Sequence, residues 1–308
     1  MNSSSSSRVV IRSLCTSQKL LNAEKKQYTP AFLKTISNAT KSPLRQSIAI
    51  TRPIGLERPT IINSKHNSFQ ISGIFKELFG SEAKERRRES VDYDLKHSLF
   101  YEAKSFTNTK GKIFTPPISY FKKEKAKYFP NFIAHPLIGP ETEFYQSLKG
   151  KVSIVRMFSK QSAFDCVKTY FETNKGDLAT DKYSEFLSQH SKSQIIDITL
   201  PNRWYEGYFL KKASGSILKK LPIERKDKYF ILPLSEFPYS VRQQLVFEIS
   251  TTGYIYVVDQ DGKIRWCTSG NANPEELAFL NKCISKLEQE LDQSQVNNIE
   301  EVSSETSA

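Results

Sequence analysis

The side chains best able to do chemistry are the cysteines and histidines, and the chain of 308 residues has four of each. They are Cys15, Cys166, Cys267 and Cys283, and His66, His97, His135 and His190. No two cysteines have the C-x-x-C spacing of a zinc site or a redox pair, and the histidines lie far from them in sequence. We therefore expect no metal and no disulfide framework, while a spatial pairing of Cys166 with another cysteine stays open.

Each cysteine outside the N-terminal segment also has a structural interpretation. Cys166 lies about one turn into an expected helix, where a cysteine is more often a small buried apolar residue than a nucleophile. Cys283 lies beside the apolar face of the last helix and has the same interpretation. Cys267 ends an expected strand, and we expect it to be exposed.

Asp259 and Asp261 resemble the start of a calcium loop, but the pattern fails further on. An EF-hand loop needs glycine at its sixth position and glutamate at its twelfth. Here the glycine is fourth, at Gly262, and the twelfth residue is Gly270. A hairpin turn explains these residues better. With no phosphate loop, H-E-x-x-H or serine elbow either, the sequence predicts no cofactor and no catalytic residue.

The elements that would position any site become regular after Gly150. Residues 151–158 are rich in β-branched side chains and predict a strand, residues 159–173 predict a helix, and residues 193–200 predict a second strand. Such a unit requires a parallel strand pair with a right-handed crossover. Residues 241–249 fit a helix or a strand, and the sequence does not decide between them.

The C-terminal pattern is the clearest in the chain. Residues 254–258 and 263–267 predict two strands joined by a turn at Gly262. Asn273 and Pro274 then supply an N-cap and a first helical residue. Apolar residues at spacings of three and four continue the helix to Leu291. Residues 292–308 carry acids and no lysine or arginine, and we expect a disordered acidic tail.

This order of elements predicts an α/β, thioredoxin-like domain over residues 141–291. An oxidoreductase of that fold has a C-x-x-C between the first strand and its helix, where the helix N-terminus lowers the thiol pKa. Here the place is taken by residues 159–162, which begin with Ser159 and end with Ser162. The usual cis-proline place reads Thr251, Thr252, Gly253. The sequence therefore predicts a protein that binds a partner and is not an enzyme.

A basic aromatic arm (residues 104–140) precedes this domain, and its five prolines disfavour long regular elements. Its aromatic side chains suit an extended segment anchored on a domain or a partner. We expect a partner- or membrane-binding surface at Phe121, Lys122, Lys123, Lys125, Tyr128 and Phe129. Bracing the edge of the domain is the alternative role. Interleaved lysines and aromatics also suit single-stranded RNA, but no RNA-binding motif accompanies them, and we expect no nucleic acid.

The net charge of +12 is concentrated at the N-terminus. Residues 1–56 hold nine basic residues and one acid, Glu24. A Ser-, Arg- and Lys-rich leader without a continuous apolar run predicts a mitochondrial transit peptide at residues 1–45. Residues 46–103 are expected to form a linker with a short amphipathic helix near residues 69–79. No stretch approaches the roughly 20 apolar residues of a membrane span.

Three stretches together carry a family resemblance. They are residues 121–131 (FKKEKAKYFPN), the region from Trp204 to Tyr208, and residues 253–259 (GYIYVVD) followed by residues 263–266 (KIRW) and the Ser269–Gly270 pair. In combination they resemble the mitochondrial ATP synthase assembly factors that act as chaperones of Fo subunit a, also called subunit 6. The resemblance covers roughly residues 110–290. Cys267 departs from the family pattern, in which a small residue is expected.

The resemblance implies a peripheral protein on the matrix side of the mitochondrial inner membrane. It implies binding of newly made subunit a and promotion of its association with the ring of c subunits, without catalysis. Two other functions stay open on the residues alone. One is a thioredoxin- or peroxiredoxin-like thiol oxidoreductase that uses Cys166, and the other is a matrix RNA-binding protein.

Overall fold

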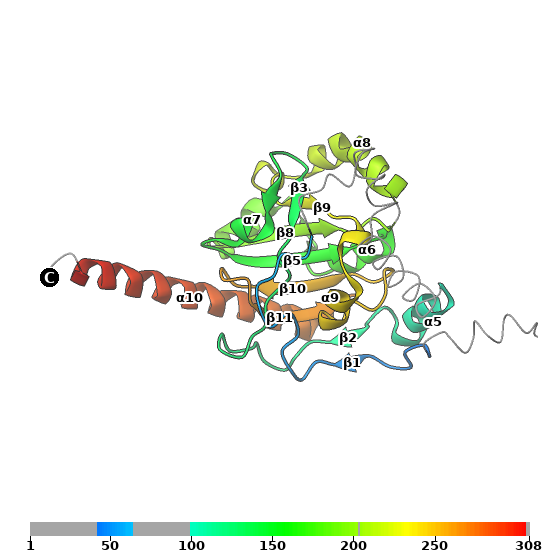
Figure 1. Cartoon of the computed structure of the whole chain (residues 1–308), viewed down its shortest axis with the longest axis horizontal. Helices are drawn as coiled ribbons and strands as arrows, with labels where there is room; N and C mark the ends of the chain where they lie inside the picture. Colours follow the sequence, from blue (N-terminus) through cyan, green and yellow to red (C-terminus); the bar gives the residue numbers. More distant parts are fainter. Residues whose placement is uncertain (1–41, 64–98, 203, 306–308) are drawn as a thin grey trace, which may run out of the picture. The chain divides into compact units, whose positions relative to one another are not determined.

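A computed structural model describes residues 42–63, 99–202 and 204–305. Its helices are α5 (Leu99–Thr109), α6 (Gln161–Lys168), α7 (Tyr183–Gln189), α8 (Trp204–Lys220), α9 (Tyr239–Gln244) and α10 (Pro274–Glu305), with short 3-10 turns η1 (Phe144–Leu148), η2 (Ile223–Arg225) and η3 (Leu234–Glu236) (Figure 1). The predicted transit peptide (1–45) falls almost wholly outside the described residues, and the predicted helix at residues 69–79 does so entirely.

One seven-stranded sheet organises the described part of the chain, in the order β11-β10-β5-β8-β9-β3-β4. Its strands are β3 (Ile133–Pro136), β4 (Thr142–Glu143), β5 (Val152–Phe158), β8 (Ser193–Thr199), β9 (Tyr229–Ile231), β10 (Tyr254–Val258) and β11 (Ile264–Ser269). Two small pairs accompany it: β1 (Ile48–Ala49) with β2 (Phe114–Thr115), and β6 (Glu172–Thr173) with β7 (Gly176–Asp177).

The strand directions confirm the thioredoxin-like prediction. β5 and β8 are parallel neighbours joined through α6, and β10 pairs antiparallel with both β5 and β11. The predicted strands at residues 151–158, 193–200 and 254–258 are β5, β8 and β10. Every residue of these three strands is buried, because both faces of the central sheet are covered.

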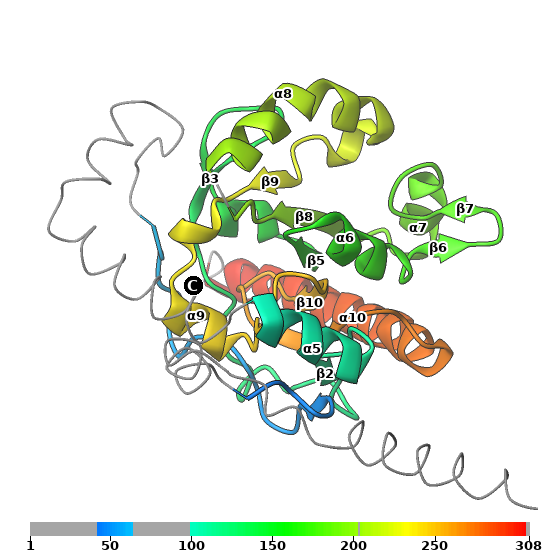
Figure 2. The ribbon, with the colours of Figure 1, turned by 90° about the vertical axis from the view of Figure 1, so that its right-hand side faces the viewer.

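The two faces of the sheet are covered differently, and the period of two along each strand separates their cores. In β5, Ile154 faces a core formed with α6, α7, α8 and α10, while Val155 faces a second core. That second core is covered by α5, α9 and segments of irregular chain. Figure 2 shows α8 near β9 and α10 near β10, so these two helices cover different parts of the same face.

Several predicted boundaries were wrong for residues that lie on the second core. The expected linker includes Ile50 and Leu56, which are buried. The expected arm begins inside α5, because residues 104–109 continue that helix. Residues 241–249, for which the sequence did not decide between helix and strand, are helical up to Gln244 and irregular after it. The apolar stretches in these segments are short, and they are buried by contacts with distant parts of the chain that the local sequence does not reveal.

The helices that flank the sheet also differ in length from the prediction. α6 ends at Lys168 rather than near residue 173, because the β6–β7 pair follows it. α10 begins at Pro274, as predicted, and continues to Glu305. The prediction of a disordered tail at residues 292–308 was therefore wrong as far as Glu305, since the acidic sequence continues the helix. None of the described helices combines the length and apolar character of a membrane span.

Candidate functional site

The place that would hold a redox pair in this fold is assembled from two segments, residues 159–162 and residues 251–253, called here the redox-equivalent site. The first segment joins β5 to α6, and the second precedes β10. The Ser162 hydroxyl donates a hydrogen bond to the Thr251 carbonyl oxygen at 2.9 Å. The two segments therefore meet as the fold predicts, with a hydroxyl where a thiol would lie. Among the described residues no peptide bond is cis.

Gly253 is required by the close approach of this segment to α6. A Cβ atom at residue 253 would lie 2.2 Å from the Ala163 carbonyl oxygen and 2.6 Å from Val167 Cγ1. Next to it, the Thr252 hydroxyl donates a 2.6 Å hydrogen bond to the Gly111 carbonyl oxygen. Residue 253 is thus packed too tightly for a proline ring, and the arm is bonded beside it.

The cysteines have the properties of structural residues. Cys166, Cys267 and Cys283 are unpaired and buried. Burial raises the pKa of the Cys166 thiol above its ordinary value, which opposes thiolate formation. Burial also raises the pKa of Cys267, and that of Cys283 to about 12. The prediction that Cys267 is exposed was wrong, because β11 is covered on both faces and this side chain lies in the second core.

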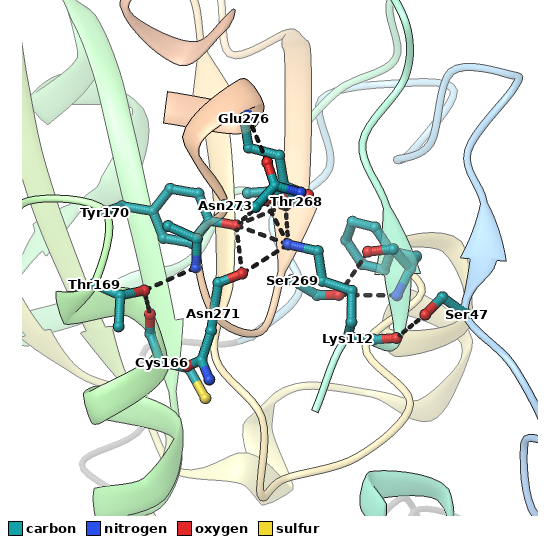
Figure 3. A network of polar contacts seen from close by, with 12 residues as sticks. Ser47, Lys112, Cys166, Thr169, Tyr170, Thr268, Ser269, Asn271, Asn273 and Glu276 are labelled. Atoms are coloured by element: carbon teal, nitrogen blue, oxygen red, sulfur yellow. Dashed lines mark hydrogen bonds and ion pairs between the residues drawn. The ribbon is translucent and has the colours of Figure 1, made fainter. Parts of the chain in front are cut away.

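Behind the redox-equivalent site lies a polar network centred on Lys112, which sequence reasoning missed (Figure 3). The Lys112 ammonium donates to the Tyr170 hydroxyl at 3.1 Å and to the Asn271 carbonyl oxygen at 2.8 Å, and it forms an ion pair with Glu276. The Tyr170 hydroxyl also donates to Glu276 Oε2, at 2.6 Å. Burial lowers the pKa of Lys112, while Glu276 opposes that shift.

The network joins the arm to the start of α10. The Asn273 side chain caps that helix by accepting the Glu276 amide hydrogen at 2.8 Å, as the sequence predicted. Glu276 then holds Lys112 of the arm and Tyr170, which follows α6. The Lys112 ammonium and the Tyr170 hydroxyl both bond to Glu276 within the protein, so the network fastens three segments together.

A second buried network, Arg156–Asp197–Arg225, was also missed. Arg156 and Asp197 are directly paired in register on β5 and β8, with two hydrogen bonds of 2.6 and 2.8 Å. Arg225, just after α8, donates to the same carboxylate at 2.8 Å. Burial opposes ionisation of Asp197, but the two guanidinium groups hold its pKa below the ordinary value. The signal in the sequence was an arginine and an acid inside two strands without other charged residues.

The Asp259–Gly262 turn is a hairpin turn, as predicted. Asp259 Oδ1 accepts hydrogen bonds from the backbone amides of Asp261 and Lys263, at 3.1 and 2.9 Å. Gly262 has a φ of 83°, which favours glycine. The carboxylate oxygens of Asp259 are used by the turn and by Arg265. In the part of the chain that the structure describes, no cluster of histidine, cysteine and acidic side chains could hold a metal ion.

Residues 121–129 of the arm lie along β11, one edge strand of the sheet, while its residues 133–136 form β3, which pairs with β9. The backbone amides of Phe121 and Phe129 donate to the carbonyl oxygens of Arg265 and Gly262, at 2.7 and 2.8 Å. Tyr128 forms β-bridges with both Leu56 and Lys263. The arm thereby covers hydrogen-bonding groups that an edge strand would otherwise present to other chains.

The six residues predicted to form a binding surface are separated by this packing. Phe129 is fully buried, which contradicts its predicted place on a surface, because its ring packs against those of Phe144 and Tyr256. Phe121 and Tyr128 are half-buried against the same core. Lys122, Lys123 and Lys125 are exposed, as a surface requires. Of these, Lys123 forms a 2.6 Å ion pair with Asp261, which raises the pKa of Lys123.

Comparison with known proteins gives a consistent result over most of the chain. The model of the family described as "ATP10 protein" matches residues 34–287. "Mitochondrial ATPase complex subunit ATP10" of Saccharomyces cerevisiae is 31% identical over 263 residues, which cover 83% of this chain and 92% of the relative. The protein of the same name from Eremothecium gossypii is 28% identical, over 78% of this chain and 85% of its own.

Several solved structures that are similar to part of the chain are thiol–disulfide proteins. One is a thiol:disulfide interchange protein DsbE from Chlorobium tepidum, with a TM-score of 0.34 and 10% identity over 53% of this chain and 96% of its own. Another is a DsbF homologue from Corynebacterium diphtheriae, with a TM-score of 0.33 and 12% identity over 54% of this chain and 90% of its own.

Proposed function

The chain belongs to the ATP10 protein family, and from this premise we propose that it is an assembly factor of the mitochondrial ATP synthase. The observation that carries the proposal is the match over residues 34–287, which includes the arm, the redox-equivalent site and most of the sheet. Relatives that share about three residues in ten bear the name of a mitochondrial ATPase complex subunit. The Arg- and Lys-rich leader is the feature of the sequence that supports import into mitochondria.

In this proposal the protein is a chaperone that binds newly made Fo subunit a and promotes its association with the c-subunit ring. It works at the matrix side of the inner membrane, as a peripheral protein. The physical reason is that an integral subunit has polar and re-entrant segments whose exposure is costly until the partner subunit arrives. A chaperone that covers those segments prevents wrong contacts without supplying chemistry.

The contact with subunit a is assigned to the exposed part of the arm. Lys122, Lys123 and Lys125 provide charge, and the half-buried Phe121 and Tyr128 provide aromatic surface beside it. Phe129 is left out of this surface because it is fully buried. The acidic or polar segments of a client would meet lysines on a segment that is hydrogen-bonded at Phe121 and Phe129 to Arg265 and Gly262, which lowers the entropic cost of binding.

Absence of catalysis is part of the proposal. Its support is the hydroxyl of Ser162 at the redox-equivalent site and the burial of Cys166. The alternative, a thiol oxidoreductase, requires Cys166. Replacement by alanine (Cys166→Ala) and by serine (Cys166→Ser) is expected to leave ATP synthase assembly intact. Loss of assembly in both variants, with the protein still present at normal abundance, would support the alternative.

The central experiment is deletion of the gene in the source organism. We expect mitochondria that retain ATP hydrolysis by F1 but lose its inhibition by oligomycin, because F1 is no longer coupled to a complete Fo sector. Capture of the tagged protein after labelling of new mitochondrial translation products should recover subunit a. Full oligomycin sensitivity after deletion would refute the proposal.

A charge-reversal variant tests the assignment to the arm. Lys122→Glu, Lys123→Glu and Lys125→Glu together should reduce cross-linking to subunit a. The matched control reverses three exposed lysines that lie outside both the arm and α8 (Lys149, Lys151 and Lys175), which changes the net charge equally. If the control reduces the cross-link as much as the arm variant does, the client contact lies elsewhere.

A further inference from the structure

The outward face of α8 carries exposed apolar and basic side chains side by side. Tyr208 and Lys212 are one helical turn apart, and the Lys212 ammonium lies 5.1 Å from the centre of the Tyr208 ring. Lys219 continues the same face, and Lys220 and Ile223 follow at the end of the helix. These five residues, Tyr208, Lys212, Lys219, Lys220 and Ile223, are called the α8 surface.

The opposite face of α8 is used by the fold. Leu210 and Ile217 pack against the core that α6, α7 and α10 share, and Leu221 is buried at the end of the helix. Those spacings of seven and four place the three side chains on one face. The helix is therefore amphipathic and anchored through its inner face, and its outer face stays available.

Two large side chains of the α8 surface are exposed to solvent and do not contribute to the core. Ile223 is 80% exposed and Tyr208 is 50% exposed. Within the described residues, Lys212, Lys219 and Lys220 form no ion pair. Lysines in the last turn complement the helix dipole, but this does not explain Lys212 or the projecting Ile223.

We propose that the α8 surface is a docking site for an anionic lipid membrane, with Ile223 and Tyr208 inserted at the interface and the three lysines on the headgroups. Without Arg225, which is buried against Asp197, residues 204–228 still hold six basic and three acidic residues, so the charge complements anionic lipid. Tyrosine and lysine are suited to an interface because each joins an apolar body to a polar tip.

A lipid surface fits these residues better than a protein partner. Lysine is depleted in protein–protein interfaces, which favour aromatic and arginine anchors. A planar surface rich in negative charge instead attracts several lysines at once, over the roughly 18 Å that residues 208–220 span in a helix. The membrane contact that the sequence predicted for the arm is thus assigned to α8. The inference rests on the proposed function in one respect, which is that the membrane is the mitochondrial inner membrane.

The test uses the full chain with one dye-labelled thiol. Ile223→Cys is compared with Ile118→Cys, a matched isoleucine in the arm that is 97% exposed. Cys15→Ser removes the leader thiol, and the other cysteines are buried. An environment-sensitive dye at residue 223 should shift to shorter wavelength with phosphatidylcholine vesicles that contain phosphatidylserine, and should not shift with phosphatidylcholine alone. The dye at residue 118 should shift with neither, which makes the readout independent of the basic leader.

Charge variants complete the test. In the Ile223→Cys protein, changing Lys212, Lys219 and Lys220 to glutamine should raise the lipid concentration for a half-maximal shift by roughly 100-fold. The same change at Lys122, Lys123 and Lys125 should leave it nearly unaltered. High salt should reverse the shift. Unchanged thermal unfolding of each variant verifies that it is folded.

Three outcomes overturn the proposal: no shift at residue 223, an equal shift at residue 118, or a shift caused by an acidic polypeptide such as polyglutamate and not by vesicles. The last outcome would make the α8 surface a protein-docking site. The vesicles contain no ATP synthase subunit, so failure here leaves the proposed assembly function standing. Failure of the deletion experiment likewise leaves the lipid contact standing.

Discussion

Residues 121–129 of the arm and the α8 surface both carry lysines, but they lie beside different strands of the sheet and differ in how the fold holds them. These arm residues run along β11, while α8 leads from β8 to β9, on the other side of β5. Figure 1 shows β11 with β2 at the bottom and α8 at the top. The arm backbone is hydrogen-bonded to β11, and Lys123 is paired with Asp261.

The difference shows that the number of lysines in a segment does not predict how many are exposed and unpaired on the folded surface. The arm looked like the more exposed binding segment because its aromatics and lysines alternate, yet Phe129 is buried and Lys123 is neutralised by a turn far away in sequence. For α8 the sequence predicted no binding surface, yet the helix and the residues after it present Ile223 and three lysines without ionic partners among the described residues. Variants that weaken the anchor of each region sharpen this contrast.

The largest effect is expected for Asp197→Asn, which removes the ionic anchor at the end of α8. It leaves Arg156 and Arg225 buried without their carboxylate, and it should lower the free energy of unfolding by about 3–5 kcal/mol. Urea unfolding of the full chain measures the loss. A loss below 1 kcal/mol would mean that solvent or another acid replaces the carboxylate.

The same variant gives a pH test. Because the folded-state pKa of Asp197 is lowered, its contribution is complete above the ordinary carboxylate pKa near ~3.9 and is lost as pH falls through the lower folded value. The difference in stability between wild type and Asp197→Asn should therefore be constant from neutral pH to about pH 4. It should shrink only in stronger acid. Shrinkage already near pH 6 would contradict the lowered pKa.

The next effect concerns the apolar anchor of the arm. Phe129→Ala should reduce stability by about 3–4 kcal/mol, because it empties a fully buried aromatic site between Phe144 and Tyr256. The control is Ile223→Ala in the α8 surface, expected within about 0.5 kcal/mol of wild type because the side chain is exposed. Equal losses in the two variants would remove the contrast between the regions.

Replacement by alanine should change the stability of the protein in opposite directions at two glycines. Gly253→Ala forces a Cβ against the Ala163 carbonyl oxygen and should cost about 1–3 kcal/mol. Gly215→Ala, in the exposed face of α8, meets no atom within 4 Å and should stabilise the protein by about 0.5–1 kcal/mol. Thermal unfolding compares them. Stabilisation by Gly253→Ala would show that α6 and residues 251–253 separate easily.

The smallest effect is expected for the arm ion pair. Asp261→Asn should change stability by less than about 1 kcal/mol, since both partners are nearly half exposed to solvent. It should instead lower the pKa of Lys123 toward its ordinary value, which titration by NMR can follow. An unchanged Lys123 pKa would mean that the pair is open in solution.

The sequence predicted the elements whose patterns are local. The β-branched run of β5, the Gly262 turn and the Asn273 cap each needed only a few adjacent residues to be recognised, and all are present. The position of Ser162 opposite Thr251 followed from the order of those elements. Each of these features depends on backbone propensity and hydrogen bonding within one turn or strand.

What the sequence did not predict depends on partners far away along the chain. Lys112 was one lysine among many until Tyr170 and Glu276 surrounded it. Arg156 and Asp197 could be recognised as a pair only once the register of β5 and β8 was fixed.

By itself, then, the sequence determined a thioredoxin-like fold without a redox pair, because residue types and spacing fix both. The tertiary structure decided which basic segment is bonded to the sheet and which remains exposed. Burial and ion pairing are properties of the space between distant segments, and composition alone does not contain them.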